Sequence, residues 1–131
     1  MQNDACKMRN ESAFASNPVV EKSFEFAVRV VNVYKYLAKR HREYTLSKQL
    51  LRCGTSIGAN IMEAQRGQGH ADFTAKMSIA LKEANETYYW LKLLHRTDYL
   101  TEEQYVSLNA AILELIGILT AICRTSQNRN I

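Results

Sequence analysis

The chain has 131 residues, 47% of them hydrophobic and 23% charged, and it carries a net charge of +4 at pH 7. This length suits one ordinary domain, which can bury a core without disulfides or a structural metal. The three cysteines are an odd number and contain no CxxC pair, which argues against a disulfide framework or a zinc site and favours a reducing compartment. No signal peptide is visible, and the nearly apolar run 115–123 is much shorter than a membrane span, so we expect a cytoplasmic protein with no membrane association.

The first seventeen residues are polar and show no hydrophobic periodicity. We expect a flexible N-terminal tail over 1–17, or alternatively a short arm that docks on a neighbouring subunit. A helix is predicted to begin at Asn17-Pro18, because asparagine can cap a helix and proline suits its first position. Apolar residues then recur every three or four positions, the period of an amphipathic helix. The basic run 39–42 suits the negative C-terminal end of that helix.

Three more amphipathic segments follow. Thr45 is the predicted N-cap of the second helix, and the joint 67–69 ends it. Residues 101–104 match a capping box, in which the side chains of the first and fourth residues each bond a backbone N–H of the other. The predicted helices are 18–42, 46–66, 71–97 and 101–126, in a bundle domain 18–127 with a frayed end at 128–131.

All three predicted connections are short, and short connections force neighbouring helices to be antiparallel. The expected fold is therefore all-α, an antiparallel up-down-up-down four-helix bundle. The last two helices carry more apolar residues than one bundle core requires, which predicts a homo-oligomer. The residues that suggest this extra apolar surface are Leu81, Trp90, Leu113 and Ile118.

The second predicted helix contains unusually small residues. Gly54 and Gly58 are four positions apart and therefore share one face. Each costs a helix interior roughly 1 kcal/mol relative to alanine, so we predict that another backbone approaches closely there. The plainer interpretation is a packing device with no direct role in function. The predicted helix-packing seam comprises Gly54, Ser56, Ile57, Gly58, Asn60 and Ile61.

The same stretch carries a resemblance. The run 54–61, GTSIGANI, resembles the signature of the four-helix-bundle family encoded by intervening sequences in bacterial 23S rRNA genes. Further matches lie at 21–27, at Asp72-Phe73, at 80–87 and at Trp90-Leu91, so the likeness spans about residues 18–125. It implies a four-helix bundle, commonly a homopentamer, with no established enzymatic activity and a suspected nucleic-acid role. The accessory protein of diversity-generating retroelements is similar in fold. One departure is Cys53, where the family pattern has serine.

Patterns that indicate catalysis are missing. The three histidines lack HExxH spacing, no Glu-x-x-His pair occurs, and no glycine-rich phosphate loop is present. Cys53 is expected to be a small core residue and not a nucleophile. We therefore expect no enzyme, no catalytic residue, no cofactor and no metal.

A group of charges on the second and third predicted helices forms a possible polar cluster. Its members are Glu63, Lys82, Glu83 and Glu86, with Lys76 or Lys82 as a partner for Glu63 if the two helices are neighbours. One interpretation is a polar site at a subunit junction, and the other is ordinary surface ion pairs. Nearby aromatic residues could stack on bases or pack in a core or interface. These are Tyr88, Tyr89 and Trp90.

The net positive charge is local. Residues 21–52 hold eight basic and three acidic residues, a net of +5, whereas the rest of the chain has nine basic and ten acidic residues. Such an excess predicts contacts with phosphates, unless it is a solvated face that serves solubility. We expect non-specific binding of RNA or DNA, or alternatively a protein-binding scaffold such as an accessory subunit of a reverse transcriptase. The candidate nucleic-acid-binding residues are Arg29, Lys35, Lys39, Arg40, Arg42, Lys48 and Arg52.

Overall fold

The structure is a computed structural model that describes residues 17–128. The predictions for the N-terminal tail and for the last three residues lie outside this range. The described part contains four helices and no strand: α2 (Pro18–His41), α3 (Thr45–Gln65), α4 (His70–Arg96) and α5 (Glu102–Asn128). The all-α four-helix bundle is thus confirmed, and each helix begins and ends within two residues of its predicted bounds.

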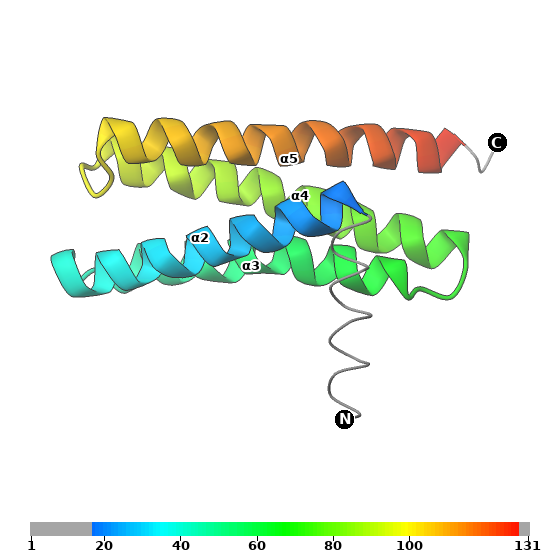
Figure 1. Cartoon of the computed structure of the whole chain (residues 1–131), viewed down its shortest axis with the longest axis horizontal. Coiled ribbons are helices and arrows are strands. Elements are labelled where there is room, and N and C mark those ends of the chain that lie inside the picture. Colours follow the sequence, from blue (N-terminus) through cyan, green and yellow to red (C-terminus); the bar gives the residue numbers. More distant parts are fainter. Residues whose placement is uncertain (1–16, 129–131) are drawn as a thin grey trace, which may run out of the picture.

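Successive helices run in opposite directions, as the colours along the chain show in Figure 1. Each helix packs on its neighbours in the chain, and α2 also meets α5, so that the four helices form a closed ring. The contact of α2 with α5 is much the loosest of the four. Within residues 17–128, no Cα atoms of the diagonal pairs α2 with α4 and α3 with α5 come within 8 Å of each other.

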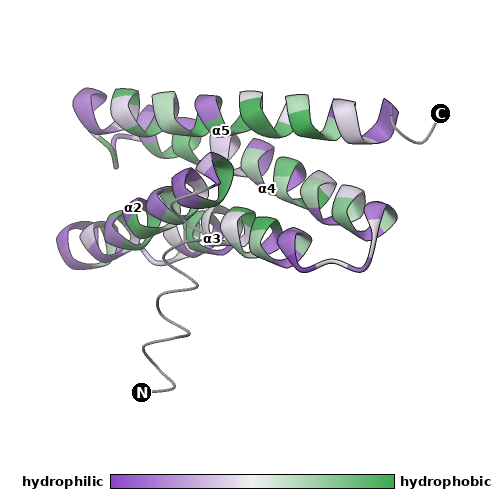
Figure 2. Ribbon diagram, turned by 45° about the vertical axis from the view of Figure 1, so that its right-hand side comes forward, coloured by the Kyte–Doolittle hydropathy of each residue, from purple (hydrophilic) through white to green (hydrophobic). Residues whose placement is uncertain are grey.

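Leucine and isoleucine side chains from all four helices fill the centre of the bundle. Each contributes about 1.5–3 kcal/mol when it is fully buried. Figure 2 shows several green, apolar turns along α5, with purple turns at both of its ends. The fully buried residues of largest volume are Leu37, Leu50, Ile57, Ile61, Met77, Leu91, Leu94, Ile112, Leu115 and Leu119.

Not all of the apolar residues assigned to an oligomer surface are exposed. Leu81, Trp90 and Ile118 are partly buried and pack against the core. Of the four, Leu113 is the one with a strongly exposed side chain, at 47%. Neighbouring helices cover the flanks of a helix as well as its inner face, which explains the difference.

The seam between α2 and α3 is formed by small residues. A Cβ atom added to Gly54 would lie 2.8 Å from Cγ2 of Val30, whereas one added to Gly58 would lie 3.4 Å from the backbone oxygen of Ser23. Gly54 is therefore the tighter of the two contacts, and both face α2. Of the other seam residues, Ile57 and Ile61 are fully buried.

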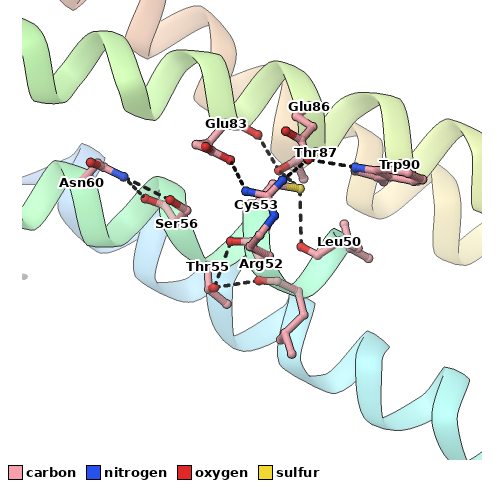
Figure 3. A network of polar contacts seen from close by, with 11 residues as sticks. Leu50, Arg52, Cys53, Thr55, Ser56, Asn60, Glu83, Glu86, Thr87 and Trp90 are labelled. Atoms are coloured by element: carbon pink, nitrogen blue, oxygen red, sulfur yellow. Dashed lines mark hydrogen bonds and ion pairs between the residues drawn. The ribbon is translucent and has the colours of Figure 1, made fainter. Parts of the chain in front are cut away.

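Ser56 and Asn60 lie beside this seam and are partly exposed. The Asn60 amide donates to the backbone oxygen of Ser56 at 2.8 Å and to its hydroxyl at 3.1 Å, as Figure 3 shows. Their polar groups therefore bond within α3 and make no polar contact with another helix in the described part of the chain.

Of the predicted N-caps, Asn17 occupies its position but makes no capping bond, Thr45 is wrong, and the capping box is confirmed. Asn17 stands at the start of α2, but its side chain donates to Gln65 at 3.1 Å and leaves the helix uncapped. Thr45 is the first residue of α3 and not its cap. The capping box at the start of α5 is present: the Gln104 N–H donates to the Thr101 hydroxyl at 3.1 Å, and the Thr101 N–H donates to the Gln104 side chain at 2.9 Å.

The cap of α3 is the carboxylate of Glu43. It accepts the backbone N–H groups of Thr45, Leu46 and Ser47 at 2.8–3.0 Å. Burial opposes ionisation of this group, but the hydrogen bonds from the backbone of Leu46 and Ser47 outweigh it, so the pKa of Glu43 lies below its ordinary value. The longer glutamate side chain reaches three amides at once, which a threonine at position 45 cannot do.

Candidate nucleic-acid interface

The seven predicted nucleic-acid-binding residues do not form one surface. Arg29 lies between α2 and α5, where its guanidinium donates to the Ser107 hydroxyl at 2.7 Å. Arg52 points the other way, from α3 to α4. The structure therefore separates these two arginines from the other five basic residues.

The charge of Arg52 is neutralised locally. Its guanidinium is paired with Glu83 at 3.4 Å and with Glu86, and the Trp90 indole N–H donates to the same Glu86 carboxylate at 3.1 Å (Figure 3). One arginine thus faces two carboxylates, so this group has a net negative charge. Phosphate would meet repulsion there, and Arg52 is not a favourable contact for it.

The other five basic residues lie at one end of the bundle, on the last two turns of α2, in the α2–α3 connection and in the first turn of α3. All five are exposed, and none has an acidic partner within 4 Å among residues 17–128. We name this group the basic end: Lys35, Lys39, Arg40, Arg42 and Lys48.

The backbone of the connection helps to keep the basic end positive. Arg42 takes the left-handed conformation, with φ 51°, and its N–H and that of Glu43 close the end of α2 by donating to Ala38 and Leu37 at 3.1 Å. Glu43, the one acidic residue within 35–52, points its carboxylate into the backbone of α3. It is therefore unavailable to pair with the lysines and arginines around it.

Two basic residues that we did not predict belong to the same end. Lys92 and Arg96 are exposed on the last two turns of α4. The antiparallel arrangement brings this end of α4 toward the end of α2, as the ring contact between His41 and Tyr99 shows. A helical-wheel argument for one helix could not find them, but the alternation of helix directions could have done so.

The glutamates of the predicted polar cluster belong to two separate sets of ion pairs. Glu63 is paired with Lys76 at 3.0 Å, and hydrogen bonding to Glu63 raises the pKa of Lys76. Glu83 and Glu86 belong to the Arg52 group (Figure 3). Lys82 is exposed and makes no ion pair within the described range. The glutamates thus act as partners of surface cations in this chain.

Cys53 is fully buried, and its sulfur accepts a hydrogen bond from the Thr87 hydroxyl at 3.2 Å. Burial raises the pKa of its thiol to about 11, which disfavours the nucleophilic thiolate. Residues 17–128 contain no group of three or more histidine, cysteine, aspartate or glutamate side chains that could hold a metal ion.

α5 is, within the described range, the one helix that is long and apolar enough to cross a membrane by these two criteria alone. Our prediction that the chain has no membrane span considered only the apolar run 115–123. That run belongs to a longer apolar stretch, which Glu114 interrupts. Core helices of soluble bundles have the same composition, and Leu108, Leu115 and Leu119 of α5 are buried in this core. However, only 28% of the apolar window is buried, and Val106 and Leu113 of α5 are strongly exposed.

Fold and charge together describe a small four-helix bundle protein with one strongly basic end. The model of the family "23S rRNA-intervening sequence protein" matches residues 15–121. The chain therefore belongs to this family, as the run 54–61 and its companion motifs had indicated.

The chain is also similar to a solved structure, the crystal structure of a protein with unknown function from the S23 ribosomal protein family of Bacteroides thetaiotaomicron. The two are 57% identical, with a TM-score of 0.79. The similarity covers 80% of this chain and 97% of the other. The search among curated proteins found no match.

Proposed function

We propose that this protein is a non-enzymatic, cytoplasmic homo-oligomer that binds RNA or DNA through its basic end, with little sequence preference. One observation carries the proposal: five exposed cations occupy one end of the bundle without an acidic partner within 4 Å in the part of the chain that the structure describes, and Glu43, the acidic residue within 35–52, is bound to backbone amides. A charged face that serves solubility alone does not require its cations to be kept apart from acidic side chains.

The mode of binding follows from the side chains. Lysine and arginine contacts to phosphate release counterions, and the logarithm of the affinity for duplex DNA falls by roughly 0.9 per contacted phosphate for each tenfold rise in salt. Phosphate contacts position a nucleic acid but do not read its sequence. Five contacts per subunit would therefore give a steep salt dependence and weak sequence preference.

The outer face of α5 supports the oligomeric part of the proposal. Val106 and Leu113 are 54% and 47% exposed, and Ala110, Gly117 and Ala121 lie on the same side of the helix. Contiguous exposed apolar surface of this kind usually marks an interface. A ring of subunits would repeat the basic end and add its contacts, and the family resemblance implies five copies.

Charge reversal tests the nucleic-acid part. Changing Lys39, Arg40 and Arg42 together to Glu should reduce affinity at least about tenfold and flatten its salt dependence. The matched control reverses Arg66, Lys82 and Arg124, three exposed cations outside the basic end. It makes the same change in net charge and should retain most of the binding.

Two results would overturn the proposal. If the unmodified protein binds neither RNA nor DNA at about 50 mM salt, where phosphate contacts are strong, the scaffold function replaces it. If both triple variants lose affinity equally, the overall charge is responsible and the basic end is not an interface. Light scattering tests the oligomer, since a mass of about 15 kDa would show a monomer.

A further inference from the structure

A polar cavity of about 450 Å³ opens beside the basic end. It lies between the last two turns of α2 and the connection from α4 to α5. Its volume falls within the roughly 300–1,000 Å³ that is usual for small-molecule sites. One residue of the basic end, Arg40, lines it, so the cavity and the proposed phosphate-binding surface are continuous.

Three rings form one wall of the cavity. The ring of His41 meets that of Tyr36 at 5.7 Å and that of Tyr99 at 5.4 Å, with interplanar angles of 72° and 87°. In an edge-to-face contact, one ring presents its edge to its partner. That partner therefore covers neither face of this ring. Tyr36 and Tyr99 are partly buried and hold the wall in place, whereas His41 is exposed at its margin.

Charges of both signs line the cavity, and they are exposed. Arg40 has no acidic partner within 4 Å in the described residues. Two carboxylates, those of Asp98 and Glu102, also line the cavity. Glu102 is fixed by His95 at 2.7 Å, whose ring stacks on Tyr105 with centroids 4.1 Å apart. Carboxylates that line a cavity repel phosphate but accept hydrogen bonds from the amino groups of bases.

We infer that this cavity takes an unpaired nucleobase, so that the protein binds single-stranded RNA or DNA in preference to duplex. The inference rests on the proposed function, because the phosphates of the same strand would contact Arg40 and the exposed cations beside it. Aromatic side chains and histidine commonly stack on unpaired bases. In a duplex the bases are paired and stacked, so none could enter the cavity without the cost of extrusion.

Fluorescence anisotropy with three labelled ligands tests the inference. They are a single strand of about 12 nucleotides, the duplex of the same sequence, and a single strand of the same length with abasic residues, each made as RNA or DNA where the chemistry allows. The single strand should bind at least about fivefold more tightly than the abasic strand, which keeps the phosphates but has no bases. The duplex should also bind more weakly than the single strand.

A pair of variants places the effect in the cavity. His41→Ala removes a ring from the wall, and Tyr44→Ala removes an exposed ring three residues away that does not line the cavity. His41→Ala should weaken single-strand binding about fivefold or more. It should leave abasic binding unchanged, and Tyr44→Ala should leave both unchanged.

The outcomes separate the two proposals. Equal binding of the single strand, the duplex and the abasic strand would refute the base site and leave non-specific phosphate binding intact. Failure of all three ligands to bind at about 50 mM salt would refute both. A single-strand preference that survives His41→Ala and falls with Tyr44→Ala would place the base elsewhere on the bundle end and overturn the assignment of this cavity.

Discussion

Helix α2 has two neighbours, α3 and α5, and it packs much more extensively against α3 than against α5. Against α3 the contact is so close that a Cβ on Gly54 would lie 2.8 Å from the side chain of Val30. Cavities flank α2 on both sides: one of about 330 Å³ next to α3, lined by Ser23 and Gly58 among others, and two of about 310 and 150 Å³ next to α5. Two polar contacts join α2 to α5. Lys22 is paired with Glu114 at 3.1 Å, and Arg29 donates to Ser107 at 2.7 Å.

The difference shows that residue size decides whether a helix pair is stabilised by close packing or by polar side chains. At the α2–α3 boundary small residues let the helices approach, and buried apolar contacts supply the free energy, which salt hardly affects. At the α2–α5 boundary exposed charged side chains span the gap, and such pairs contribute little and are screened by salt. We therefore expect the bundle to open first between α2 and α5.

Enlarging Gly54 should have the largest effect on stability. Gly54→Leu forces a side chain into the position of Val30, which is fully buried, so overpacking should lower the free energy of unfolding by about 3 kcal/mol. Gly58→Leu should cost about 1–3 kcal/mol, because only the atoms beyond its Cβ would meet the backbone of Ser23. Urea denaturation measures both.

Gly58→Ala is the matched control. Its single added carbon would lie in ordinary contact, 3.4 Å from Ser23, so it should not destabilise the protein. It should unfold at the parent's urea concentration or a higher one, because alanine favours a helix interior by roughly 1 kcal/mol over glycine. Combining Gly54→Leu with Val30→Ala should recover part of the lost stability, because the smaller alanine leaves room for the new leucine side chain. If Gly54→Leu unfolds like the parent, α2 and α3 are not held by close approach, and the contrast with the α2–α5 boundary fails.

The cap of α3 gives the next largest effect. Glu43→Gln keeps the size of the side chain but removes the charge that three amides face, and it should cost about 1–2 kcal/mol. The folded pKa of Glu43 is lower than its unfolded value of about 4.5. Its contribution is therefore fully present above that pH and is lost as the pH falls through the folded pKa.

Urea denaturation of the parent and Glu43→Gln proteins across this acidic range tests the cap. The difference between their unfolding free energies should be constant above about pH 5 and should shrink toward zero in more acidic solution. A difference that does not change with pH would mean that the ionised carboxylate is not the source of the stability. The tight α2–α3 boundary would then depend on packing alone, without help from the connection that leads into it.

Features that depend on neighbouring residues in the chain could be predicted from the sequence. The apolar period indicated the four helices, the spacing of Gly54 and Gly58 indicated a close contact, and residues 101–104 indicated a capping box. Each of these patterns is complete within one or two turns of helix. The residue that caps each helix was harder to predict. The Asn17 side chain bonds to another helix, whereas that of Glu43 reaches the first amides of α3, and both outcomes depend on the folded structure.

Features that depend on distant residues could not be predicted. Nothing near Arg52 shows that Glu83 and Glu86, more than thirty positions away, will neutralise it. The cavity beside the basic end likewise combines residues from position 36 to position 102. Predicting such a site requires the angle and spacing of packed helices, which are set by side-chain packing across the bundle.

The smallest expected effect is at the α2–α5 boundary. A double-mutant cycle of Lys22→Ala and Glu114→Ala should give a coupling energy of about 0.2–1 kcal/mol, since both side chains are about half exposed. Raising the ionic strength to about 1 M should abolish most of it, because the Debye length then falls to about 3 Å. The Gly54→Leu effect should persist under the same conditions. A coupling well above 1 kcal/mol, or one that salt does not reduce, would mean that this ion pair fastens α2 to α5 as firmly as packing fastens α2 to α3.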